Sequence, residues 1–372
     1  STAASVNGPI SVYGRNITAN GSLISNASGE AILLKASSGI TTAASCTLQT
    51  DGGNITLWAD ADGPNGGAIF LGNSNTLDSR SSADRTAANT LTATGGGHIT
   101  LAGGSAVDAN GLPTGYAINL AANGLELGTS NSGTLAIYSG GGDVRIKGES
   151  KAANSTANYG VNVLSALTIH TGTGRLDMQG LSSANTGLSA DNVVLSIESA
   201  ATSGTAISLV GNTTSTGGRG LQMLGAAQTK TIAATGGGSI VMSGEDIQQT
   251  FGSIALTSTN LLSHSGAIEM FGSNTVLFVS GVNLGSLAGS PVTSSSAPIN
   301  LTGNKITTQS GSTVIATSGT VTMQPSGDDF TASQTLTGFS FSGNETGLTI
   351  GKSASSADGT SDADVTLSTA AS

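Results

Sequence analysis

Two acidic stretches of the chain space their oxygen-bearing side chains as part of a calcium-binding loop does. They are "DADGPNG", from Asp60 to Gly66, and "SDADV", which begins at Ser361. Calcium takes roughly six to eight oxygen ligands, and neither stretch supplies a full set of spaced oxygens with a closing glutamate. Asp60 and Asp62 are therefore the candidate calcium ligands. The alternative is that no metal binds, and no other cofactor is predicted.

A second possible chemistry is the cleavage of an acidic polysaccharide, for which Arg145, Asp328 and Asp329 are the candidate residues. Acid–base cleavage needs carboxylates placed together beside the reacting bond, whereas the 22 acidic residues of this chain are scattered along it. Arg145 belongs to "RIK", in which apolar Ile146 alternates with two charges that suit an exposed strand face. The sequence therefore predicts no enzyme, and a polysaccharide hydrolase or lyase is the alternative.

The other residues with metal-binding or nucleophilic side chains are three histidines and one cysteine. His98, His170 and His264 have no neighbouring His, Cys or carboxylate at the spacing of a metal site, so we expect all three on the surface. Cys46 is the only cysteine and cannot form a disulfide within the chain. We expect it to pack as a small apolar residue.

Several of these residues lie in a short sequence motif that occurs in seven similar copies along the chain. It begins as "GGNITLWAD" at Gly52 and "GGHITLAGG" at Gly96. The other copies are "GGDVRIKGE" at Gly141, "TGRLDMQGL" at Thr173, "GGSIVMSGE" at Gly237, "SGAIEMFGS" at Ser265 and "SGTVTMQPS" at Ser318.

Two positions of this repeat are apolar in every copy, and the residue between them varies freely. The first position holds Ile55, Ile99, Val144, Leu176, Ile240, Ile268 and Val321. The second holds Leu57, Leu101, Ile146, Met178, Met242, Met270 and Met323. Because the residue between them accepts charges of either sign, we expect it to face water. Such alternation predicts a strand with one buried face, and the preceding glycine predicts a turn.

Other short strands of the same kind fill the intervals, bounded by Gly, Asn, Ser or Thr, and essentially no α-helix is expected. Repeats that cannot each enclose a core must stack and share one. The sequence therefore predicts an all-β fold, a parallel β-helix solenoid that forms one elongated domain over residues 1–372. Turns of the coil, called rungs below, of about 20–25 residues would number roughly 15–18 and give a rod roughly 70–90 Å long.

The composition predicts a surface with few charges. Only 9% of the residues are charged, against about 25% in an average globular protein. The 12 basic residues are outnumbered by 22 acidic ones, so the surface repels phosphate and no nucleic-acid partner is predicted. No apolar run reaches about 18 residues, so no membrane span is predicted either.

The first part of the chain resembles a known family. The stretch from Gly8 to Gly72, with "ILLKASSGIT" and "GGNITLWADADG", is similar to the repeat region of filamentous haemagglutinin-like bacterial exoproteins. The similarity is close over about the first 150 residues. Beyond them, only the general sequence pattern of the family's repeats continues. It implies a right-handed parallel β-helix, export across two membranes with an outer-membrane secretion partner, and work as an adhesin or biofilm filament.

The resemblance also implies a place and a set of partners. The chain would lie on the bacterial cell surface or outside the cell, as the stalk of a longer exported protein. Its partners would be glycans or proteins of host cells or matrix, or neighbouring copies of itself. The alternatives are the polysaccharide-cleaving enzyme described above and a discrete glycan-binding module.

Four residues are candidates for modification or for contact with sugars. Among the Asn-x-Ser/Thr sequons, Asn154 and Asn212 stand in loop-like stretches and are the candidate glycosylation sites. Trp58 and Phe271 each follow a buried position of the repeat. Each is able either to stack on a sugar or to pack against a loop.

The longest interruptions of the repeat are the loops that we expect to contact partners. They span residues 78–93, 105–113 and 149–159. If the chain is only a spacer, replacing such a loop changes local stability alone. If it is a binding module, one loop or face recognises the ligand and a single substitution abolishes attachment.

Overall fold

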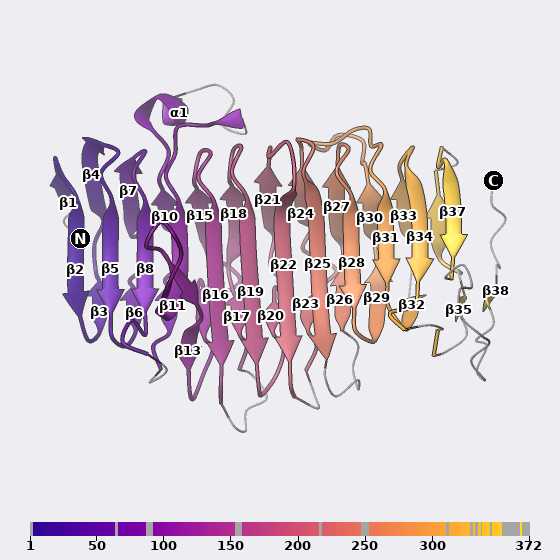
Figure 1. The fold of residues 1–372 in the computed structure, drawn as a ribbon, viewed down its shortest axis with the longest axis horizontal. Helices are drawn as coiled ribbons and strands as arrows, with labels where there is room; N and C mark the ends of the chain where they lie inside the picture. Colours follow the sequence, from indigo (N-terminus) through magenta and orange to yellow (C-terminus); the bar gives the residue numbers. More distant parts are fainter. Residues whose placement is uncertain are drawn as a thin grey trace.

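Strands coil into three long parallel sheets that run the length of a rod (Figure 1). This computed structural model describes residues 3–63, 66–86, 92–152, 158–215, 218–246, 253–309, 312–327, 330–331, 334–335, 337–342, 344–351 and 365–366. A strand of sheet 1 is followed in the chain by one of sheet 2 and then one of sheet 3, after which the chain returns to sheet 1 one rung further on. The predicted all-β parallel β-helix is confirmed.

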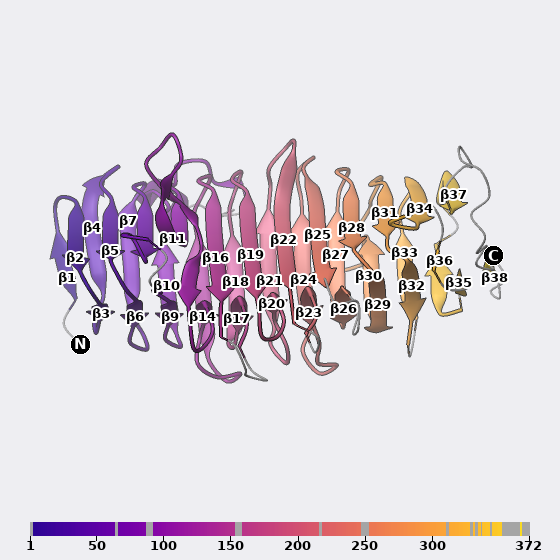
Figure 2. The same ribbon diagram turned by 60° about the horizontal axis from the view of Figure 1, so that its bottom comes forward.

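Each sheet stacks its strands one after another along the rod, and those of sheet 3 follow one another along the lower edge of Figure 2. Sheet 1 contains β1 (Ala4–Val6), β4 (Leu23–Ser28), β7 (Thr47–Asp51), β10 (Asn75–Asp78), β15 (Thr134–Tyr138), β18 (Ala166–His170), β21 (Leu195–Ser199), β24 (Lys230–Ala234), β27 (Thr259–Ser263), β30 (Val282–Gly285), β33 (Thr313–Ala316) and β36 (Phe339–Phe341). Sheet 2 contains β2 (Ile10–Gly14), β5 (Ile32–Ala36), β8 (Ile55–Ala59), β11 (Ile99–Val107), β16 (Val144–Ser150), β19 (Leu176–Ser182), β22 (Thr205–Thr213), β25 (Ser239–Asp246), β28 (Ile268–Gly272), β31 (Ile299–Thr302), β34 (Thr320–Gln324) and β37 (Gly347–Ile350), with β12 (Pro113–Gly115) and β13 (Ala117–Asn119) beside this path. Sheet 3 contains β3 (Ile17–Ala19), β6 (Ile40–Thr42), β9 (Ile69–Leu71), β14 (Leu125–Leu127), β17 (Val161–Val163), β20 (Leu188–Ser189), β23 (Leu221–Met223), β26 (Ile254–Thr257), β29 (Thr275–Ser280) and β32 (Lys305–Thr308). A separate pair joins β35 (Gln334–Thr335) to β38 (Val365–Thr366).

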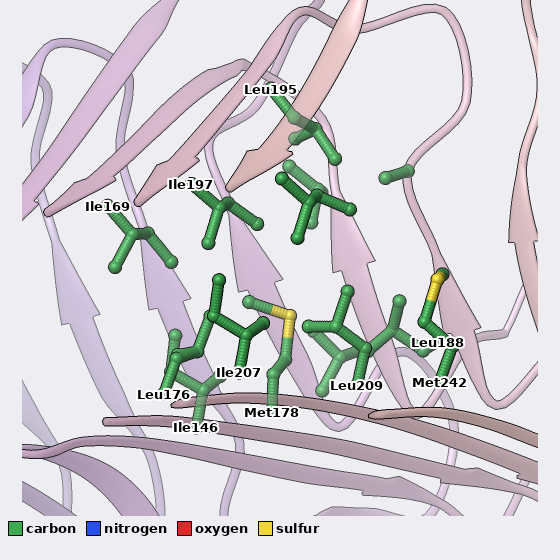
Figure 3. Close-up of a cluster of buried hydrophobic side chains, with 14 of the residues drawn as sticks. Ile146, Ile169, Leu176, Met178, Leu188, Leu195, Ile197, Ile207, Leu209 and Met242 are labelled. Carbon is green, nitrogen blue, oxygen red and sulfur yellow. The ribbon is translucent and has the colours of Figure 1, made fainter. Parts of the chain in front are cut away.

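The repeat of the sequence is the register of sheet 2. Ile55 of β8 pairs with Ile99 of β11, and Ile99 pairs with Val144 of β16. All residues at the two apolar positions of the seven copies are buried, as expected. They meet the inward side chains of the other sheets in one continuous core, and Figure 3 shows Ile146 and Met178 of sheet 2 near Ile197 of sheet 1.

Where sheet 1 turns into sheet 2, successive rungs come so close that only glycine fits. A Cβ atom on Gly97 would lie 2.4 Å from the carbonyl carbon of Gly53, and one on Gly142 would lie 2.1 Å from the carbonyl oxygen of Gly97. Gly174 meets Gly142 at 2.1 Å in the same way. Real Cβ contacts below 3.0 Å essentially never occur. These glycines are therefore required by contact between rungs, and not only by the turn that the sequence predicted.

Buried hydroxyl groups satisfy the carbonyl groups of these turns. Thr50 Oγ1 donates to the Gly53 carbonyl at 2.6 Å, and Thr171 Oγ1 donates to the Gly174 carbonyl at 2.7 Å. Ser139 makes the corresponding bond to its own turn. All three side chains are fully buried, so the bonds replace water that cannot reach these carbonyls.

The rungs are longer and fewer than predicted. Sheet 1 has twelve strands among the described residues, which gives a rod of about 50 Å at about 4.8 Å per strand, rather than 70–90 Å. The reason is that long insertions stay within one rung, as the direct pairing of Ile99 with Val144 shows.

One insertion contains a helix, although essentially none was expected. The helix, α1 (Ser82–Thr86), is five residues long and projects from the rod near β10 (Figure 1). Across the described parts of the chain, no helix has the length and apolar character needed to cross a bilayer.

A second insertion covers part of sheet 2. Thr56 and Thr100 occupy the position expected to face water, yet they are only 5% and 1% exposed. Next to them β11 continues to Val107 and β12 returns antiparallel to it. We call residues 104–116 the hairpin, and it lies against the outer face of sheet 2.

Candidate functional site

A groove on the outer face of sheet 2 is lined by a mixed set of polar and charged side chains. Its floor is a row of Thr100, Arg145, Asp177 and Ser208, which lie opposite one another on β11, β16, β19 and β22. They face outward because each stands between two buried positions of the repeat. The groove, called the sheet-2 groove below, has a volume of about 360 Å³.

The hairpin forms one wall of the sheet-2 groove, through Asp108, Asn110 and Leu112. Arg145 Nη1 donates to Asp108 Oδ2 at 2.8 Å and to the Pro113 carbonyl oxygen at 3.2 Å, so the floor holds the hairpin in place. Partial burial raises the pKa of Asp108. The hydrogen bonds from Arg145 and from the Leu112 and Asn110 amides outweigh that effect and leave this pKa below its ordinary value.

The opposite rim is a ladder in which each side chain accepts a hydrogen bond from the backbone of the next rung. Asn54 Oδ1 accepts the His98 N–H at 2.8 Å, and His98 Nδ1 accepts the Asp143 N–H at 3.0 Å. Asp143 Oδ1 then accepts the Arg175 N–H at 2.9 Å. Because His98 Nδ1 accepts this hydrogen bond, its Nε2 is the ring nitrogen left to face other partners. His98 is half-buried and structural, not simply a surface residue.

Two of the groove carboxylates are already paired with cations. Asp108 is bound to Arg145, and Asp177 lies 3.7 Å from Lys147 Nζ and accepts a hydrogen bond from Gln179 Nε2 at 2.8 Å. Arg145, one of the three candidate enzyme residues, therefore braces the hairpin. The other two, Asp328 and Asp329, lie outside the described residues.

The two candidate calcium ligands differ in their exposure. Asp60 is fully buried, and its Oδ1 accepts the Gly66 N–H at 3.1 Å across the loop that follows β8. Asp62 is exposed. Within the described ranges no group of three or more His, Cys, Asp or Glu side chains is arranged to hold a metal ion.

The two candidate aromatic residues differ in their exposure. Trp58 is 8% exposed, its Nε1 donates to the Gly104 carbonyl oxygen at 2.7 Å, and Lys35 Nζ lies 3.8 Å from its ring centroid. The ring thus packs against the hairpin and is not a platform for a sugar. Phe271 of β28 is 44% exposed on the outer face of sheet 2, so its ring is accessible.

One of the two candidate glycosylation sites, Asn212, does not lie in a loop. Asn212 is half-buried within β22 and pairs with Leu181 and Glu245, so it is not in a loop. The strand itself was expected from "GTAISLVGN", Gly204 to Asn212, but Asn212 at its end was assigned to the loop because the following residues are Thr and Ser. Asn154 lies outside the described residues, as does part of the predicted 149–159 loop.

Cys46 and two of the histidines complete the comparison. Cys46 is 1% exposed, its Sγ donates to the Ala19 carbonyl at 3.3 Å, and burial raises the pKa of the thiol. His264 is exposed as expected, but His170 is not, because its Nε2 is buried without a hydrogen-bond partner. Burial lowers the pKa of His170. Burial raises the pKa of Glu198, which lies opposite His170 on the neighbouring strand β21 of sheet 1.

Most of the groove was missed from the sequence. Asp143, Arg175 and Asp177 come from two different copies of the repeat and Asp108 from outside it, so only the stacking of rungs brings them together. The one usable signal was position, because three of them lie within copies of the repeat. Function has to be inferred from the fold and from this groove. No family model matches the chain, and neither does any curated protein or solved structure.

Proposed function

We propose that the chain is the stalk or repeat region of a bacterial adhesin or extracellular filament, exported to the cell surface, where it acts in attachment or in biofilm assembly. The observation that supports this best is the unbroken stacking of sheet 1 from β1 to β36. A single apolar core runs beneath those strands from Ile17 to Phe339. Such an arrangement gives length and stiffness rather than a closed catalytic centre.

The physical properties of the rod fit this role. Each rung contacts only its neighbours, so rungs are added or lost with little effect on distant ones. The outer surface has few charges and many small polar groups, and it stays hydrated without attracting nucleic acid. The proposed role is non-catalytic.

The partners in this proposal are those that the family resemblance implies. They are an outer-membrane secretion partner for the parent protein and, outside the cell, glycans or proteins of host cells or matrix, or neighbouring copies of the chain. The resemblance of Gly8–Gly72 to filamentous haemagglutinin-like repeats supports these assignments.

Location is tested by labelling intact cells of the source bacterium with an antibody raised against the folded chain. We expect labelling without permeabilisation. Labelling that needs permeabilised cells would refute the extracellular location.

The spacer role is tested by removing one complete rung from the parent protein. Ile240 pairs with Ile268, so deleting residues 240–267 joins two rungs in register. We expect a folded rod shortened by about 5 Å, with attachment retained. Deleting residues 240–253 joins strands of different sheets and is the matched control, expected to unfold the rod locally. If the deletion of 240–267 folds and reaches the surface but abolishes attachment, the chain is more than a spacer.

A further inference from the structure

The sheet-2 groove is formed by two kinds of element that a plain spacer does not need. The hairpin stands beside the sheet as a wall, and a floor cation, Arg145, holds it there by two hydrogen bonds of 2.8 and 3.2 Å. Arg145 and Asp177 carry opposite charges and lie opposite each other on neighbouring strands of the floor. Such a pair stands out in a protein with only 9% charged residues. We propose that this groove binds a neutral oligosaccharide, and this assignment does not depend on the stalk role.

The size of the groove suits a short sugar chain. Its volume of about 360 Å³ is within the range of small-ligand sites. Thr100 lies beneath the hairpin, so the uncovered floor runs from Arg145 to Ser208 across three adjacent strands, which is about 10 Å at about 4.8 Å per step. That length accommodates about two pyranose rings laid along the rod axis.

The lining offers hydrogen-bond donors and acceptors side by side. Hydroxyl groups come from Thr205 and Ser208, an amide comes from Asn110, and a carboxylate comes from Asp143. Arg175 supplies a guanidinium group whose only side-chain hydrogen bond in the described structure is a 3.4 Å contact with the Ser203 carbonyl. Each hydroxyl of a sugar both donates and accepts, so a surface with alternating groups of this kind fits it.

The charges of the groove favour a neutral sugar over an acidic one. Its three carboxylates, Asp108, Asp143 and Asp177, outnumber its two guanidinium groups. Arg145 is already neutralised by Asp108, and Asp177 lies 3.7 Å from Lys147 Nζ. The groove is left with one cation, Arg175, and one carboxylate, Asp143, outside these ion pairs, so it offers an anionic polymer no net attraction. The groove is also poorly suited to an apolar ligand, because two of its three apolar lining residues, Val144 and Leu176, are 0% and 1% exposed and Leu112 alone remains in the hairpin wall.

The binding surface is rigid before a ligand arrives. The Asp177 carboxylate is held by Gln179 Nε2 at 2.8 Å, and Gln179 Oε1 in turn accepts a hydrogen bond from the Tyr116 hydroxyl of the hairpin at 3.2 Å. Floor residues stand on paired strands and not on loops. Groups fixed in this way lose little conformational entropy on binding, which favours measurable affinity for a small ligand.

The test measures binding of four tetrasaccharides to the purified chain by isothermal titration calorimetry and saturation-transfer NMR. Cellotetraose, mannotetraose and N-acetylchitotetraose are the neutral probes, and tetragalacturonic acid is the anionic one. Ser208→Trp places a large ring at the β22 end of the floor. Asn300→Trp is its matched control, because Asn300 occupies the same outward position on β31, beyond the groove, and is equally half-buried.

We expect at least one neutral probe to bind and the anionic probe to bind more weakly. Ser208→Trp should lower the affinity about tenfold or more, while Asn300→Trp should leave it within about twofold, and both variants should melt alike. Raising the salt concentration should change the affinity for the neutral probe by less than about twofold, since no net charge is transferred.

Three outcomes would overturn the proposal. They are tighter binding or cleavage of tetragalacturonic acid, no binding of any neutral probe at millimolar concentration, and equal binding by the two tryptophan variants. None of them bears on the rung-deletion test of the stalk, so the two proposals fail separately.

Discussion

The column of glycines between sheets 1 and 2 makes a demanding prediction about a single added methyl group. In Gly142→Ala the new Cβ would stand 2.1 Å from the carbonyl oxygen of Gly97 in the preceding rung. The obstacle is backbone on a paired strand, so it cannot swing aside as a side chain would. The two rungs must therefore separate at this corner.

The cost follows from how far they must move. Reaching even a 3.0 Å contact requires a separation of about 0.9 Å, and the adjacent hydrogen bond, from the Ile99 N–H to the Asp143 carbonyl at 3.0 Å, would then be lost. Overpacking costs roughly 1–3 kcal/mol and the lost bond about 1 kcal/mol. Alanine returns about 0.4–1 kcal/mol by restricting the unfolded chain. We expect a net loss of about 2–3 kcal/mol.

The measurement combines urea unfolding with amide hydrogen exchange. Trp58, the only tryptophan, reports unfolding near β8, and exchange at Ile99 and Val144 reports opening at the altered corner. Gly8→Ala is the control, because nothing lies within 4 Å of its added Cβ. If Gly142→Ala unfolds within about 0.5 kcal/mol of the original protein and exchanges no faster at these amides, close contact does not explain the glycine column.

Substitutions at three further residues test polar groups that are buried or half-buried. Lys230 is fully buried, and its Nζ donates to three backbone carbonyls. We expect Lys230→Met to lower the free energy of unfolding in urea by about 2–3 kcal/mol. An unchanged free energy would mean that water satisfies those carbonyls. His98→Ala removes the acceptor of the Asp143 N–H and should cost about 1 kcal/mol, whereas His98→Asn should cost little because Asn54 makes the same bond one rung earlier. Burial raises the pKa of Glu198 in the folded protein above its ordinary 4.5. The folded state therefore favours the protonated carboxyl, and this contribution to stability is fully present below pH 4.5. It is lost as the pH rises through the raised pKa. Glu198→Gln should therefore melt higher than the original protein at pH 7 and equal it near pH 4, and an equal melting temperature at both pH values would contradict this.

The fold was readable from the sequence because its signal is local and repeated. Two apolar residues separated by one other residue, such as Ile55 and Leu57, predict a strand from the local sequence alone. Five strands of sheet 2 escaped the repeat because their flanking residues differ. Their residues in the same register are Ile10, Ile32, Ile207, Ile299 and Leu348. The number of rungs was overestimated because insertion length is not encoded in the strands themselves.

The site was not readable, because it depends on contacts between distant segments. Nothing near Asp108 indicates that it will meet Arg145, and nothing near Trp58 shows that the hairpin will cover it. Both contacts arise when the hairpin folds back on sheet 2. The same insertion also turned two threonines that were expected to face water into buried residues.

Parallel stacking also decides how the rod responds to mechanical force. The hydrogen bonds between rungs point along the long axis, so tension applied along that axis loads the few bonds of an end rung at a time instead of all bonds together. A stretched rod would then unwind rung by rung, releasing about 75 Å of chain for the rung from Ile10 to Ile32 and about 150 Å for that from Ile99 to Val144. A cell held by such a tether in flowing liquid would dissipate a sudden pull in steps, and its attachment would survive loads that snap a rigid link.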